Sequence, residues 1–156
     1  MTNAELLKEL EKKFEKMKNE LGFKASLDEL ERIFYIKDDI LKDGYVSEAL
    51  SRQICHRIVD TYGSWANYLH SIIMPNPQNI LNMSEAKIFS QEEKKEVTEL
   101  MKNAMQISSN NSLIGLNKDK VAEAKFIDYA VEFWDSEFGP KLIKIMKKIK
   151  EEWEKE

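Results

Sequence analysis

Two histidines, one cysteine and the polar residues beside them are the side chains with the clearest chemical potential. His56 and Asp60 are four positions apart, so their side chains can meet on one helix face. A carboxylate that orients an imidazole is the pattern of a general base, and it is also an ordinary surface pair. Cys55 adjoins His56 but projects about 100° away from it on a helix, where a lone cysteine behaves as a small apolar residue. We therefore predict no catalytic residue and lean against an enzyme.

A metal or nucleotide site has no better support. His56 and His70 would lie about 21 Å apart along one helix, too far to share an ion. Gln53 and Asn67 stand three positions before the histidines, where a di-iron bundle needs glutamates. The sequence has no cysteine pair and no His-Glu-x-x-His motif, and its five glycines are widely spaced. We predict no metal and no cofactor.

A run of lysines near the C-terminus is the feature that suggests nucleic-acid binding. Residues 140–150 carry five lysines and no acidic residue, and Lys141, Lys144 and Lys148 share one helical face. Such a face could contact the phosphates of RNA or DNA or an anionic membrane surface, or it could simply be solvated. The net charge is -4, and the chain has only three arginines, the residue type that recognises phosphate through two parallel hydrogen bonds. Nucleic-acid binding is therefore an alternative rather than the leading hypothesis.

The spacing of apolar residues predicts that helices position all these side chains. Apolar residues recur at steps of three and four, Ser26 and Ser90 begin capping boxes, and Gly22 and Gly44 are placed to end helices. No segment alternates as a strand does. We predict an all-α bundle of five to six helices, with a break or kink at Gly139-Pro140. The predicted ranges are 4–21, 27–43, 48–73, 91–107, 118–138 and 140–154.

Two connections follow from the gaps between these helices. Residues 78–90 fit either a loop or a short helix, and residues 108–117 are predicted to form a loop. Leu113, Ile114 and Leu116 make the second loop too apolar to be merely solvated. We expect these side chains to fold back onto the core or to meet another subunit.

Length and composition set the broad class of protein. The 156 residues predict a single helical domain over 1–156, from which helices 4–21 and 140–154 could extend. One cysteine excludes an internal disulfide. No apolar run reaches the roughly 18 residues of a membrane span, and the N-terminus shows no secretory pattern. We therefore expect a cytoplasmic protein.

One stretch of the chain is nearly free of charge. Residues 45–83 hold four charged residues in 39, whereas the average composition would place about thirteen there. On the predicted helix 48–73 one side is apolar and the opposite side is polar but almost neutral. This polar side is either covered by neighbouring helices or lines an interface or pocket. Its candidate ligand-binding residues are His56, Asp60, Asn67 and His70.

Two further surfaces are candidates for protein contacts. The first predicted helix carries apolar residues at the spacing of a coiled-coil seam, which could pair with a second copy of the chain. Its candidate interface residues are Leu7, Leu10, Phe14 and Met17. Asp128, Glu132 and Asp135 form an acidic stripe that is either solvated or a docking surface for a basic partner.

These patterns favour a non-enzymatic interaction protein that self-associates through its helices or binds another protein. The alternative is an accessory subunit of an RNA or DNA complex that uses Lys141, Lys144 and Lys148. A third hypothesis is a small-molecule enzyme or sensor that uses the polar side of helix 48–73.

Overall fold

The computed structural model of this protein describes residues 1–155, and they are all-helical as predicted. Eight α-helices and one π-helical segment follow one another, without a strand in this part of the chain. Helix α7 (Lys120–Phe133), the π-helical segment η1 (Trp134–Phe138) and helix α8 (Gly139–Glu154) run on without interruption, so residues 1–155 form seven separate helical rods. The prediction of five to six helices was therefore too low. The cause is a break at residue 35 and a short helix after residue 79.

The chain forms two compact units. Unit 1 comprises Met1–Thr61 and Ser109–Glu132, and unit 2 comprises Tyr62–Ser108 and the chain from Phe133 on. Helices α4 (Leu50–Ile73) and α6 (Gln91–Asn117) contribute residues to both units. The prediction of one domain over the whole chain stays a prediction.

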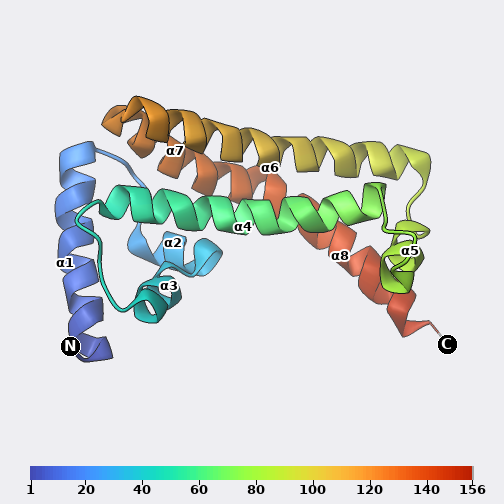
Figure 1. Ribbon diagram of the computed structural model, residues 1–156, viewed down its shortest axis with the longest axis horizontal. Coiled ribbons are helices and arrows are strands. Elements are labelled where there is room, and N and C mark those ends of the chain that lie inside the picture. The colour runs from blue at the N-terminus through green and yellow to red at the C-terminus, as the bar shows by residue number, and fades with distance from the viewer. Residues whose placement is uncertain (156) are drawn as a thin grey trace. The chain divides into compact units, whose positions relative to one another are not determined.

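Unit 1 begins with three helices that have clear local start and stop signals. Helix α1 (Asn3–Leu21) starts at a Thr2–Glu5 capping box and ends at Gly22, whose left-handed backbone (φ 76°) favours glycine. Helix α2 (Leu27–Phe34) starts at the predicted Ser26 capping box. Helix α3 (Ile36–Asp43) ends at Gly44, also left-handed. In Figure 1, α1 stands beside α2 and α3 at the blue end of the chain.

The single helix predicted over 27–43 is wrong, because Tyr35 separates α2 from α3. Tyr35 has a left-handed backbone (φ 57°, ψ 44°), which costs free energy for a residue with a Cβ. Because the helix ends here, the carbonyl oxygen of Phe34 bonds to a side chain outside the helix. Arg57 Nε donates to it at 2.6 Å. Glu31 also accepts from the Lys37 amide, at 2.6 Å. Contacts beyond the helix therefore stabilise this turn.

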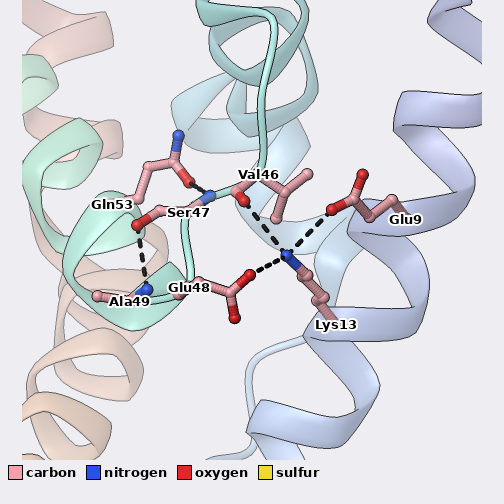
Figure 2. A network of polar contacts seen from close by, with 7 residues as sticks. All are labelled: Glu9, Lys13, Val46, Ser47, Glu48, Ala49 and Gln53. Atoms are coloured by element: carbon pink, nitrogen blue, oxygen red, sulfur yellow. Dashed lines mark hydrogen bonds and ion pairs between the residues drawn. The ribbon is translucent and has the colours of Figure 1, made fainter. Parts of the chain in front are cut away.

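A lysine joins α1 to the segment that precedes α4. Lys13 Nζ lies 3.0 Å from Glu9 and 3.0 Å from Glu48, and it donates to the carbonyl of Val46 at 3.4 Å. Figure 2 shows this network together with Ser47, which accepts from the Ala49 amide. Because two carboxylates accept hydrogen bonds from its ammonium group, the pKa of Lys13 is raised.

The predicted loop 108–117 is wrong, since α6 continues to Asn117. Serine and asparagine favour turns locally, but Asn111 and Ile114 are both buried in unit 1 and hold the segment as a helix. A Cβ on Gly115 would lie 3.0 Å from Arg52 Nη2, so glycine leaves room for that guanidinium. Leu113 and Leu116 are exposed rather than folded onto the core.

The rest of unit 1 comes from the first turns of α4 and from α7 (Lys120–Phe133). Asp128 on α7 accepts hydrogen bonds from the backbone amides of Lys24 and Ala25 at 2.8 to 2.9 Å. This carboxylate of the predicted acidic stripe thus fixes the connection between α1 and α2. It is a structural contact within one chain.

Unit 2 contains the end of α4, helix α5 (Ile80–Ala86), the first part of α6, the π-helical segment η1 (Trp134–Phe138) and helix α8 (Gly139–Glu154). Helix α4 ends at Ile73, shortly before Pro75, as predicted. Glu85 on α5 accepts from Tyr68 at 2.8 Å and from Trp153 at 2.9 Å, which ties α5 to α4 and α8.

The predicted break at Gly139-Pro140 is wrong in form. The chain remains helical there, and the irregularity is the π-helical segment η1 immediately before Gly139. Pro140 lies just after this segment, inside a continuous helical run, and a proline there removes one backbone hydrogen bond from the run. No helix within residues 1–155 has the length and apolar character needed to cross a membrane.

Candidate functional site

The predicted polar face of α4 is open to solvent. His56 and Asp60, in unit 1, and Asn67 and His70, in unit 2, are all exposed. The alternative that neighbouring helices cover this face is therefore wrong for the described chain. None of these four residues lines the grooves described below, and a binding role for them stays a prediction.

Cys55 behaves as a core residue. Its side chain is fully buried, and burial raises the pKa of the thiol to about 12. The thiol is therefore protonated at neutral pH. A protonated, buried thiol does not attack electrophiles.

The coiled-coil seam predicted on α1 packs inside its own unit. Leu10 and Phe14 are fully buried, and Phe14 contacts Phe23 edge to face with ring centroids 5.7 Å apart. Leu7 and Met17 are half-buried. As an oligomer interface this seam is wrong for Leu10 and Phe14, because apolar side chains buried against their own chain have no surface to offer a second copy.

Helix α8 lines two grooves of unit 2. We call the first the mixed-charge groove. It has a volume of about 630 Å³ and lies between α8 and the first turns of α6. Its apolar floor comes from Phe89, Val97, Leu100 and Ile145.

The rims of the mixed-charge groove have opposite charge. Helix α6 supplies the glutamates, and α8 supplies the three lysines that were candidates for nucleic-acid binding. The charged lining residues are Glu92, Glu93, Glu96, Glu99, Lys95, Lys141, Lys144 and Lys148. Four carboxylates and four ammonium groups cancel, so this surface does not present the net positive charge that a phosphate backbone needs.

An ion pair joins α6 and α8 near one end of this groove. Lys148 bonds to Glu93, and its Nζ also lies 5.4 Å from the centroid of the Phe89 ring, within cation–π range. The carboxylate of Glu93 accepts hydrogen bonds from Lys148 and from the backbone amide of Ser90, and these lower the pKa of Glu93 to about 2. This pair fixes the distance between α6 and α8 at that point.

We call the second groove the tryptophan groove. It has a volume of about 350 Å³ and is walled by Trp65 of α4, Trp134 of η1 and residues of α8. The α8 residues that line it are Gly139, Leu142, Ile143, Met146, Lys147 and Lys150. Its charged residues are all basic, and Lys150 pairs with Glu154. Ile143 is 57% exposed.

An aromatic cluster and a glycine position Trp134 in this wall. Tyr62 contacts Trp134 and Phe138 edge to face at 5.6 and 4.9 Å between centroids. A Cβ on Gly139 would lie 2.8 Å from the Trp134 carbonyl oxygen and 3.0 Å from its Nε1. Glycine is therefore required at 139, because it lets the indole lie against the backbone of α8. π-Helical segments occur often at functional sites.

Unit 1 holds a buried polar cluster that the sequence did not predict. Glu123, 2% exposed, accepts from Ser51 at 3.1 Å and lies 3.3 Å from Arg52 Nη1 and 3.5 Å from Lys120 Nζ. The contact with Arg52 has the distance of an ion pair without hydrogen-bond geometry. Buried charges need such partners, so the cluster is a structural link between α4 and α7.

Sequence patterns missed the tryptophan groove for a definable reason. Trp65, Trp134 and Leu142 follow the apolar periodicity of their helices, which predicts core positions. Only the neighbouring helices decide whether such a side chain is covered.

Within residues 1–155 no group of three or more histidine, cysteine, aspartate or glutamate side chains could hold a metal ion.

No family model matches this chain, and neither a curated protein nor a solved structure matches it.

Proposed function

We propose that this chain is a non-enzymatic helical interaction protein, and that its tryptophan groove receives an amphipathic helix of a partner protein. The observation that carries the proposal is the groove itself, in which two tryptophans and the exposed Ile143 form an apolar surface on unit 2. Tryptophan is enriched among the residues that dominate binding energy at interfaces. Helices commonly bind by laying an apolar face into such a groove.

The charges around the tryptophan groove indicate the flanks of the partner helix. Lys147 and Lys150 are exposed at its edge, and no acidic residue lines it. A partner helix with acidic residues beside its apolar face would complement these ammonium groups, while a basic one would be repelled. We therefore propose an acidic amphipathic helix as the occupant.

The other hypotheses have weaker support. A nucleic-acid role would rest on lysines that face glutamates across the mixed-charge groove. A role in small-molecule chemistry would rest on four exposed residues of α4, none of which lines the two grooves of α8. Self-association stays a prediction, and a sedimentation-velocity experiment across a range of protein concentrations measures it directly.

A peptide titration tests the proposed function. The probe is a helical peptide of about 18 residues with leucines at steps of three and four and glutamates on both flanks. Calorimetry should show binding to the wild type and at least tenfold weaker binding to Ile143→Lys. Because Ile143 is exposed, this variant should fold normally. Val121→Lys is the control, since Val121 is 66% exposed in unit 1. Equal affinity for the wild type and Ile143→Lys, or no binding at all, overturns the proposal.

A further inference from the structure

We infer that the mixed-charge groove is a second docking site, for a partner helix that carries acidic residues along one flank of its apolar face and basic residues along the other. The inference concerns a different surface from the tryptophan groove and does not depend on it. The shared helix α8 divides the two surfaces.

An ion pair between Glu93 and Lys148 joins α6 to α8 near one end of the groove. Following α6 forward from this pair leads to Glu96 and Glu99. Following α8 backward leads to Lys144 and Lys141 on the opposite rim. The α6 rim also carries Lys95, which pairs with Glu92. The groove is therefore bordered by a rim of net negative charge on α6 and a basic rim on α8.

These two rims do not neutralise each other directly. Within residues 1–155, Glu96, Lys141 and Lys144 form no ion pair, and Glu99 has only a 3.7 Å contact with Lys102, its neighbour on α6. Opposite charges that face each other without contact leave room for an occupant between them. A helix in that space could pair its basic flank with α6 and its acidic flank with α8.

The floor supplies the apolar contact that such an occupant needs. Val97 and Leu100 are almost fully buried, so the apolar surface that an occupant can reach comes mainly from the half-buried Ile145 and from the methylene chains of the lysines beside it. Contact with this limited apolar surface contributes to affinity, while the two charged rims select the partner and disfavour helices of uniform charge. A nucleic acid would be repelled by the glutamates of the α6 rim.

Three peptides with the same leucine face test this inference. One has glutamates on one flank and lysines on the other, the second has glutamates on both flanks, and the third has lysines on both. The readout is the methyl resonances of Ile145, in the mixed-charge groove, and of Ile143, in the tryptophan groove. The mixed peptide should shift the Ile145 methyl and bind there about tenfold more tightly than either uniform peptide.

Reversing the charge of the α8 rim is the second part of the experiment. Lys141→Glu with Lys144→Glu makes both rims acidic, so the groove should now prefer the peptide with two lysine flanks. Lys8→Glu with Lys12→Glu is the matched control, because both lysines are exposed on α1 in unit 1. The control should keep the wild-type order of affinities.

The inference is overturned if the three peptides bind equally at Ile145, or if charge reversal leaves their order unchanged. It is also overturned if no peptide shifts Ile145, or if single-stranded RNA binds there more tightly than the mixed peptide. Failure of the proposed function would instead appear at Ile143, as an unshifted methyl with the glutamate-flanked peptide. The two failures are therefore separate observations.

Discussion

Ile143 and Ile145 are two residues apart on α8, yet their side chains line different grooves. Ile143 lines the tryptophan groove with Trp65 and Trp134, whereas Ile145 lies on the floor of the mixed-charge groove with Val97 and Leu100. On a helix, positions two apart project about 200° from each other, so one turn of α8 serves two surfaces.

This arrangement predicts that the two isoleucines can be disrupted independently. Ile143→Lys should weaken binding of the glutamate-flanked peptide at least tenfold and leave binding of the mixed peptide unchanged. Ile145→Lys should do the reverse, because a lysine on the apolar floor would be partly buried. Calorimetric titrations of both variants with both peptides measure this. Parallel losses in both variants would show that the grooves act as one surface, contrary to our account.

Gly139→Ala should destabilise the protein by about 1–3 kcal/mol. The added methyl group would overlap the Trp134 carbonyl oxygen at 2.8 Å, and the indole would have to move. Urea denaturation gives the free energy of unfolding, and tryptophan emission reports the displacement.

Gly63→Ala is the matched control for this substitution. Gly63 lies within α4 with nothing within 4 Å of the added Cβ. Its replacement should stabilise the protein by about 0.5–1 kcal/mol, because alanine is the better helix former. A neutral Gly139→Ala would mean that Trp134 is not held against α8 as described.

The ion pair between Glu93 and Lys148 predicts a pH dependence of stability. The hydrogen bond from Lys148 lowers the pKa of Glu93 from its ordinary 4.5 to about 2 in the folded protein. The unfolded state therefore binds a proton at higher pH than the folded state does. The stabilisation is complete above pH 4.5 and is lost as the pH falls towards 2.

The measurement is a comparison of the wild type with Glu93→Gln across this pH range. The wild type should be the more stable protein at pH 6, and the difference in free energy of unfolding should shrink steadily to near zero at about pH 2. High salt should reduce the difference at pH 6, since the pair is only partly shielded from solvent. A difference that does not vary with pH would contradict the assigned pairing.

Asp128→Asn should cost about 1–3 kcal/mol of stability. The carboxylate accepts from two backbone amides with its two oxygens, whereas an asparagine would turn an NH₂ group towards one of those donors. Glu132→Gln, on an exposed residue of the same predicted stripe, should change stability by less than about 0.5 kcal/mol. Equal effects of the two substitutions in thermal or urea unfolding would refute the special role of Asp128.

Sequence reasoning succeeded where local signals determine structure. The capping boxes at Ser26 and Ser90 and the left-handed glycines Gly22 and Gly44 mark real helix ends. Each is decided by residues within one turn, and the periodicity of apolar residues then identifies the all-α class.

The predictions failed for features that depend on contacts between distant parts of the chain. The break at Tyr35 is stabilised by Arg57, 22 positions later, and the serine- and asparagine-rich end of α6 is helical because Asn111 and Ile114 pack into unit 1. The two grooves depend even more on the contacts between distant segments. Trp65 and Trp134 have ordinary core periodicity, and only the arrangement of α4 and α8 leaves them in the wall of a groove. In the sequence, the spacing of the lysines of α8 is typical of a phosphate-binding face. In the structure, the glutamates of α6 line the same groove on the opposite side.

The most direct test of the proposed function is the methyl spectrum of Ile143 during a titration with the glutamate-flanked peptide. Our account predicts a saturable shift of the Ile143 methyl with little change at Ile145, accompanied by a change in tryptophan emission from Trp65 and Trp134. A spectrum in which Ile143 does not move, while the peptide is shown to bind elsewhere or not at all, would contradict it.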